Sequence, residues 1–176
     1  MRCWQEDKAW SDAVTPEIKR ILGEHLIGES PMEEDQKHNT DLMVLCMKPL
    51  RIACRVRREE YRMRYPNEFT IRSSRPDVRT ELEKMLEGWG THLFYGFSDG
   101  VKLTAWTLAD LSVFRSWWCD YVARCGWPPG RYFENADGSS GFKVFEWSEL
   151  PDNFIVARLD PNADVDLTAL LASLGK

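Results

Sequence analysis

The chain has 176 residues, a length that predicts one domain. Hydrophobic residues make up 43% of it and charged residues 29%, the balance of a globular protein with enough apolar mass for a core. No apolar stretch approaches the roughly 20 residues of a membrane helix, and the start of the chain lacks the apolar segment of a signal peptide. The five cysteines include no Cys-x-x-Cys pair, which disfavours zinc sites and disulfides. We therefore expect a cytoplasmic protein with no membrane contact.

The net charge of −5 is unevenly distributed. Residues 51–79 contain nine arginines, no lysine and four acidic residues, so this segment carries nine minus four, or +5, and the remainder carries −10. A basic segment in an acidic protein indicates a local anionic partner, unless the arginines pair with the acidic remainder of the fold. The absence of lysine favours specific contacts, because the planar guanidinium group binds anions through paired hydrogen bonds.

The first expected helix spans residues 16–27, with Pro16 in its first turn and Gly28 after its end. Two strands are expected next, over 42–47 and 51–58, and a Lys-Pro turn joins them into a hairpin. In the second strand arginine alternates with apolar residues. Because successive side chains of a strand point to opposite faces, one face is expected to carry Arg51, Arg55 and Arg57.

The remaining pattern predicts a strand, a helix, two strands and a helix in turn, over 68–72, 78–90, 91–99, 101–110 and 111–126. In the tail, the turn signal NADGSSG is expected to lie between the short runs FKVFEW and NFIVARL, and a last helix is expected near Asp166 to Leu174. The predicted fold class is α/β (α+β), with an αβββαβ core whose mixed central sheet is flanked by helices. The core covers residues 1–126, and a small β-rich C-terminal extension, residues 127–176, packs on the same domain.

This order of elements, with Asp41 opening the hairpin, resembles the PD-(D/E)XK (restriction-endonuclease-like) nuclease superfamily over residues 15–97. The stretches TDLMVL, RIACRVRR, EFTIRS and TELEKMLEGWG also resemble uncharacterised proteins of phages and mobile elements. In the superfamily an aspartate opens one strand and the next carries (D/E)-x-K. The resemblance implies that Asp41 takes the position of the first aspartate. It implies that Arg55 stands at the position of the second acid and Arg57 at the position of the lysine. A further acid often lies in the first helix, where Glu17 and Glu24 are the candidates.

The resemblance implies a Mg²⁺ centre, in which two carboxylates hold the metal and the lysine stabilises charge. Arg55 cannot ligate a metal, so a replacement acid is needed. Glu81, with Lys84 three residues later, is the candidate; alternatively, TELEK is only a helix start whose acids favour its positive end. The predicted catalytic residues are therefore Asp41, Glu81, Arg57 and Lys84, with Asp41 and Glu81 as metal ligands.

Aromatic residues interleave with the arginines of the basic segment at Tyr61, Tyr65 and Phe69. Such surfaces stack bases and hold the backbone of nucleic acids. In the alternative interpretation the aromatic rings pack inside the fold and the arginines are solvated. The predicted nucleic-acid-binding residues are Arg51, Arg55, Arg58, Arg62, Arg64 and Arg72.

Two classes of function follow from these patterns. The first is a nucleic-acid-directed enzyme, a Mg²⁺-dependent endonuclease with a rearranged site that acts on DNA or RNA. The second is a non-catalytic binding protein of phage type that engages or inhibits a host protein, nucleoprotein or defence complex. The missing acid favours loss of catalysis, whereas the arginines favour retained binding of phosphate or of an acidic partner.

Overall fold

The first helix, α1, spans Trp4–Leu26 and is longer than the predicted helix over 16–27. The structure is a computed structural model, which describes residues 4–29, 42–44 and 51–159. Pro16 lies inside the helix, although proline removes one backbone hydrogen bond. Tertiary packing offsets that loss, because one apolar stripe of α1 is buried against the central sheet, at Val14, Ile18 and Ile21.

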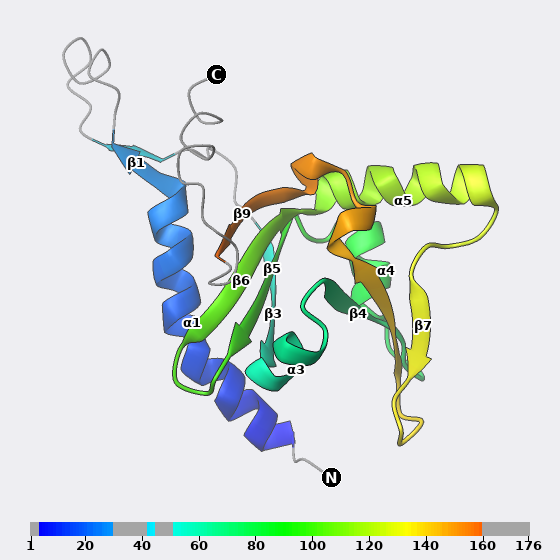
Figure 1. Cartoon of the computed structure of the whole chain (residues 1–176), viewed down its shortest axis with the longest axis horizontal. Helices are drawn as coiled ribbons and strands as arrows, with labels where there is room; N and C mark the ends of the chain where they lie inside the picture. The colour runs from blue at the N-terminus through cyan, green and yellow to red at the C-terminus, as the bar shows by residue number, and fades with distance from the viewer. Residues whose placement is uncertain (1–3, 30–41, 45–50, 160–176) are drawn as a thin grey trace.

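In the part of the chain that the structure describes, the central sheet has four strands in the order β3-β5-β6-β9, with bounds Ile52–Arg58, His92–Ser98, Leu103–Asp110 and Ile155–Leu159. The first pair is parallel and the other two are antiparallel, so the sheet is mixed. A second, antiparallel sheet has the order β4-β8-β7, with bounds Glu68–Ser74, Gly141–Glu146 and Arg131–Glu134. The predicted α+β class, with a mixed sheet flanked by helices, is confirmed (Figure 1).

The predicted hairpin is wrong for the residues that the structure describes. The strand β2, Leu42–Val44, pairs in antiparallel fashion with β1, Ile27–Glu29, and not with β3. β3 instead pairs with β5, and it is an edge of the sheet as far as the chain is described. Parallel neighbours need a crossover connection, which is supplied by the helix α3, Glu59–Arg64, the strand β4 and the helix α4, Glu81–Leu86. Local periodicity identified the strands, but their partners lie far away in the sequence.

The C-terminal segment supplies strands to both sheets. The NADGSSG turn lies between β7 and β8, and not between the runs FKVFEW and NFIVARL. β8 pairs with β4 of the second sheet, and β9 pairs with β6 of the central sheet. The helix expected near Asp166 to Leu174 lies outside the described residues. None of the helices in the described ranges is long and apolar enough to cross a bilayer.

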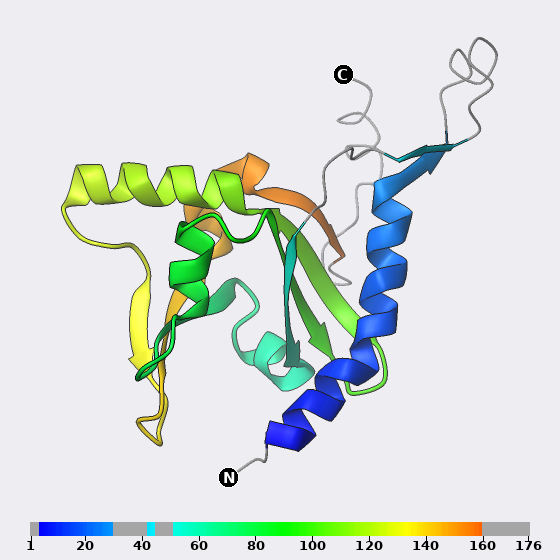
Figure 2. The same ribbon diagram turned by 180° about the vertical axis from the view of Figure 1, so that it is seen from behind.

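Two hydrophobic clusters cover the two faces of the central sheet. Phe94 and Trp106 stack on the α1 side, with ring centroids 5.7 Å apart. On the other face Tyr95 joins the larger cluster, which fills the space between the two sheets and the helix α5, Leu111–Cys125. Figure 2 shows the molecule from behind. The helix α1 runs along one face of the central sheet, and α5 lies at the upper end of the strands and extends away from α1. This two-sided burial explains the nearly continuous apolar run of β5.

Two short helices flank the strand β3. The helix α3 spans Glu59–Arg64 directly after it. The helix α4 spans Glu81–Leu86, much shorter than the predicted helix over 78–90. It begins where Thr80 and Glu83 form a capping box, and it stops before Gly88, whose φ of 88° is left-handed. Trp89 therefore lies beyond the end of α4 and not on its apolar stripe.

The capping box of α4 makes a pH-dependent contribution to stability. Hydrogen bonds from the backbone and side chain of Thr80 hold the pKa of Glu83 below its ordinary value of 4.5. Because the pKa is lower in the folded chain, this stabilisation is present above pH 4.5 and is lost as the pH falls through the lowered pKa. We expect Glu83→Gln to lower the melting temperature at neutral pH, with the gap to the wild type closing in acid. Thermal unfolding followed by circular dichroism checks this, and a gap independent of pH would contradict it.

Candidate functional site

The outer strand β3 divides its side chains between the two faces of the central sheet. Ile52 and Val56 pack toward α1, whereas Ala53 packs into the cluster between the sheets. Residues two apart share a face, so Arg55 and Arg57 lie on the same side as Ala53, the side of α4 and the second sheet. The alternation that the sequence predicts for this strand is therefore present.

Arg55 is neutralised by Glu81. Its Nη1 donates to Glu81 Oε2 at 2.7 Å, and both side chains are about one quarter exposed. The same oxygen accepts a hydrogen bond from the backbone N–H of Arg72 at 3.2 Å. Glu81 therefore links β3, β4 and α4. The structure brings together two of the predicted site residues, but as an ion pair and not as two metal ligands.

The described side chains around Glu81 do not fit a Mg²⁺ centre. Its close neighbour Arg55 offers only N–H donors, whereas Mg²⁺ needs oxygen ligands. Among the side chains described within residues 4–29, 42–44 and 51–159, no group of three or more histidine, cysteine, aspartate or glutamate residues comes together. Asp41, the other predicted ligand, lies outside these ranges. Glu17, the candidate acid of the first helix, accepts a hydrogen bond from the backbone N–H of Leu103 at 2.7 Å.

A cavity of about 310 Å³ lies at the start of β3, and we call it the Arg51 cavity. Its lining includes Arg51, Glu81, Lys84 and Trp89. Glu81 and Lys84 share one face of α4, as their spacing predicts, and Lys84 is exposed. Trp89 falls inside the helix expected over 78–90; because α4 ends at Leu86, its side chain lies beyond the helix and is 62% exposed.

A second cavity, of about 260 Å³, lies at the other end of β3, and we call it the tyrosine cleft. Arg57 of β3, Tyr61 of α3 and Tyr65, which directly follows α3, line it, and the second sheet adds Arg131 and Phe133. The guanidinium carbon of Arg57 lies 4.0 Å from the centroid of the Tyr61 ring, a cation–π contact. Arg131 and Phe133 were missed, although the two aromatic residues of RYFE, a short run between two turn signals, favour a strand, in which residues two apart share a face.

The remaining predicted arginines are in different environments. Arg62 is buried and paired with Glu59 at 2.7 Å, which assigns it a structural role. Arg58 points toward α1, with its guanidinium carbon 5.9 Å from the Trp10 ring. Arg64 and Arg72 are exposed. Phe69 is fully buried, so the sequence interpretation that placed it on a base-stacking surface is wrong.

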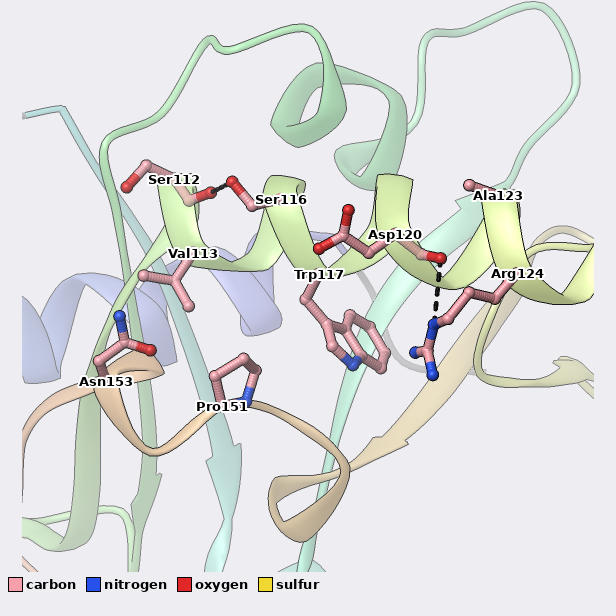
Figure 3. Close-up of a pocket in the computed structure, with 9 residues that line it drawn as sticks. All are labelled: Ser112, Val113, Ser116, Trp117, Asp120, Ala123, Arg124, Pro151 and Asn153. Carbon is pink, nitrogen blue, oxygen red and sulfur yellow. Dashed lines mark hydrogen bonds between the residues drawn. The ribbon is translucent and has the colours of Figure 1, made fainter.

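A hollow of about 550 Å³ lies between α5 and the loop around η2, Asp152–Phe154 (Figure 3). Its lining includes Trp117, Asp120, Arg124 and Pro151. Arg124 Nε donates to the backbone oxygen of Asp120 at 3.3 Å, so this polar contact runs along the helix itself. The hollow contains none of the predicted site residues, and the polar contacts drawn in it do not converge on one point.

Comparison of the chain with models of protein families, with curated proteins and with solved structures finds no significant match. The resemblance to the PD-(D/E)XK superfamily therefore stays a prediction that rests on Asp41 and on the order of the elements. The features that bear most directly on function are the face of β3 and the two cavities at its ends.

Proposed function

We propose that this protein binds single-stranded nucleic acid along the face of β3. The observation that supports the proposal most strongly is the repetition of one arrangement at both ends of that strand. Arg51 and the exposed Trp89 line one cavity, and Arg57 and the exposed Tyr61 line the other. Guanidinium groups bind phosphate, and exposed aromatic rings stack on unpaired bases.

The distance between the two cavities suits an extended strand. Arg51 and Arg57 are six residues apart, which corresponds to about 20 Å along a β-strand. Between them the Arg55–Glu81 pair is nearly neutral, so the positive charge is concentrated at the two ends. The chain outside residues 51–79 carries −10, and this charge disfavours a broad duplex on the surrounding surface. Both features favour a single strand as the ligand.

The second candidate function is the Mg²⁺-dependent endonuclease. One observation favours it: Glu81 and Lys84 line the same cavity as Arg51. In this candidate Asp41 would supply the second carboxylate. Cleavage of DNA or RNA that requires Mg²⁺ and is lost in Asp41→Ala would support it over binding alone.

The proposal predicts salt-dependent binding through Arg51 and Lys84. We expect labelled single-stranded DNA or RNA to bind with an affinity that falls steeply with salt. The double variant Arg51→Ala, Lys84→Ala should flatten the plot of log K against log salt by about 1.4, or about 0.7 for each lost phosphate contact. Fluorescence anisotropy at a series of salt concentrations, with and without Mg²⁺, measures both quantities.

Arg124→Ala is the matched control. Arg124 is an exposed arginine in the last turn of α5, on a different element from the two cavities (Figure 1). Its loss should leave the slope unchanged. A wild-type protein that binds neither DNA nor RNA would overturn the proposal and would leave an acidic protein partner, sought by pull-down from a host lysate.

A further inference from the structure

Two of the aromatic rings that line the tyrosine cleft, one from each side of it, are positioned by contacts with neighbouring side chains. Tyr61 lies on α3 and Tyr65 directly follows its last residue; the two side chains are 37% and 43% exposed. Arg57 lies over the Tyr61 ring. Phe133 is 46% exposed and stacks on Phe142, with centroids 6.0 Å apart and planes at 21°. Three exposed rings thus line one small cavity. The Tyr61 ring is positioned by its contact with Arg57, and the Phe133 ring by its contact with Phe142.

Polar groups accompany the rings. The hydroxyl of Thr70, a buried residue in the lining, lies 3.4 Å from the Tyr95 hydroxyl. Glu68 and Arg131 form an ion pair, and both also line the cleft. The cleft therefore offers a hydroxyl, a carboxylate and a guanidinium beside an aromatic surface. Bases carry hydrogen-bond donors and acceptors on the edges of a flat ring, which matches this combination.

The volume limits what the cleft can hold. Sites for drug-sized ligands measure about 300 to 1,000 Å³. A cavity of about 260 Å³ lies just below that range, so a single planar ring system fits better than an extended molecule. Arg57, at the β3 side of the cleft, is placed to meet the phosphate attached to such a ring.

We propose that the tyrosine cleft takes one unpaired base of a bound single strand, stacked against Tyr61 and Phe133. This inference rests on the proposed function and adds a base-binding site to it. The Arg51 cavity then holds the backbone farther along the strand, and the cleft gives the protein its preference for unpaired nucleic acid.

Oligonucleotides with and without bases test the cleft separately from phosphate binding. We compare a labelled single-stranded oligonucleotide with one of the same length in which all sugars are abasic. The wild type should bind the first about tenfold more tightly, the size of a typical base–aromatic stacking contribution. In Tyr61→Ala and in Phe133→Leu that ratio should fall several-fold, to the part that stacking on Trp89 supplies, while the affinity for the abasic strand stays the same.

Tyr132→Leu is the matched control, because Tyr132 is 51% exposed and precedes Phe133 in β7, so it points to the opposite face of the same strand. It should keep the wild-type ratio. Thermal unfolding of each variant verifies that it folds; the replaced rings are exposed, so folding should be retained. A 2-aminopurine in place of one base adds a direct readout, since its fluorescence is quenched on stacking.

The possible failures are distinguishable. Equal affinity of the wild type for the normal and abasic strands overturns the base site while leaving phosphate binding intact. Absence of binding to both strands overturns the proposed function, and this inference with it. Binding of a free nucleoside monophosphate without any binding of oligonucleotides would also overturn the inference in the form stated, because the site would then serve a small molecule.

Discussion

Replacing Phe69 with alanine is expected to lower the free energy of unfolding by about 3 to 5 kcal/mol, the usual loss when a buried phenylalanine is truncated. Phe69 is fully buried on β4, and among the described residues its ring contacts five other aromatic rings. The closest are those of Trp147 at 4.3 Å and Phe145 at 5.3 Å between centroids; the others belong to Tyr95, Phe114 and Phe154. Truncation leaves a cavity where the two sheets and α5 meet. Because small domains are stable by about 5 to 15 kcal/mol, the variant should be only marginally folded.

Denaturant unfolding measures this loss as a shift of the midpoint at unchanged slope. Phe133→Ala is the matched control, because the same side chain is removed from a position that is 46% exposed. Because Phe133 stacks on Phe142, its truncation should cost about 0.5 to 1.5 kcal/mol, well below the loss at Phe69. Similar losses for the two variants would contradict the assignment of Phe69 to the centre of the aromatic cluster.

The contrast between Phe69 and Phe133 also shows where sequence reasoning reached its limit. Phe69 follows an arginine-rich, tyrosine-containing segment, so the local pattern placed it on a binding surface. What buries it is β8, which pairs with β4 from about 70 residues farther along the chain. Local periodicity does not specify such a partner, and the second sheet was therefore absent from the predicted core.

Elements with clear end signals were predicted well. The helix expected over 111–126 is α5, Leu111–Cys125, because Asp110 caps its start and Gly126 ends it with a φ of 81°. The helix expected over 78–90 proved much shorter. Thr80 is its N-cap, so it begins after the expected start, and Gly88 has a left-handed backbone, so it ends before the expected end. These shifts matter for the site: they expose Trp89 and place Glu81 in the first turn, opposite Arg55.

The alternation in β3 predicted which arginines share a face of the sheet. It did not predict which of them are free of ion pairs with the chain's own acids and so able to bind a ligand. That depends on the positions of Glu81 and Glu59, which are set by helix starts that follow different strands. The alternative interpretation of the basic segment, in which arginines pair with the chain's own acids, therefore applies to Arg55 and Arg62. At Arg57 the guanidinium lies instead against the ring of Tyr61.

Glu81→Gln is expected to weaken the fold and strengthen nucleic-acid binding at the same time. The carboxylate joins Arg55 to the backbone of Arg72, so its loss should cost about 1 kcal/mol, the upper end for a pair that is partly exposed. The same change removes the negative charge between the two cavities and releases the guanidinium of Arg55. If Arg55 then contacts one more phosphate, the plot of log K against log salt should steepen by about 0.7. Thermal unfolding and anisotropy titrations measure the two effects in one variant.

Glu87→Gln is the control for this experiment, because it removes the same charge beside the same helix from a carboxylate that pairs with Arg79 and not with β3. It should leave the salt slope near the wild-type value. The opposite pattern for Glu81→Gln, an unchanged melting temperature with loss of a Mg²⁺-dependent cleavage, would assign Glu81 to a metal centre completed by Asp41. The two roles exclude each other for this carboxylate. As a structural acceptor Glu81 forms the ion pair with Arg55, whereas as a metal ligand it would have to break that ion pair. Stability and binding measured together therefore distinguish a binding protein from an enzyme at this position.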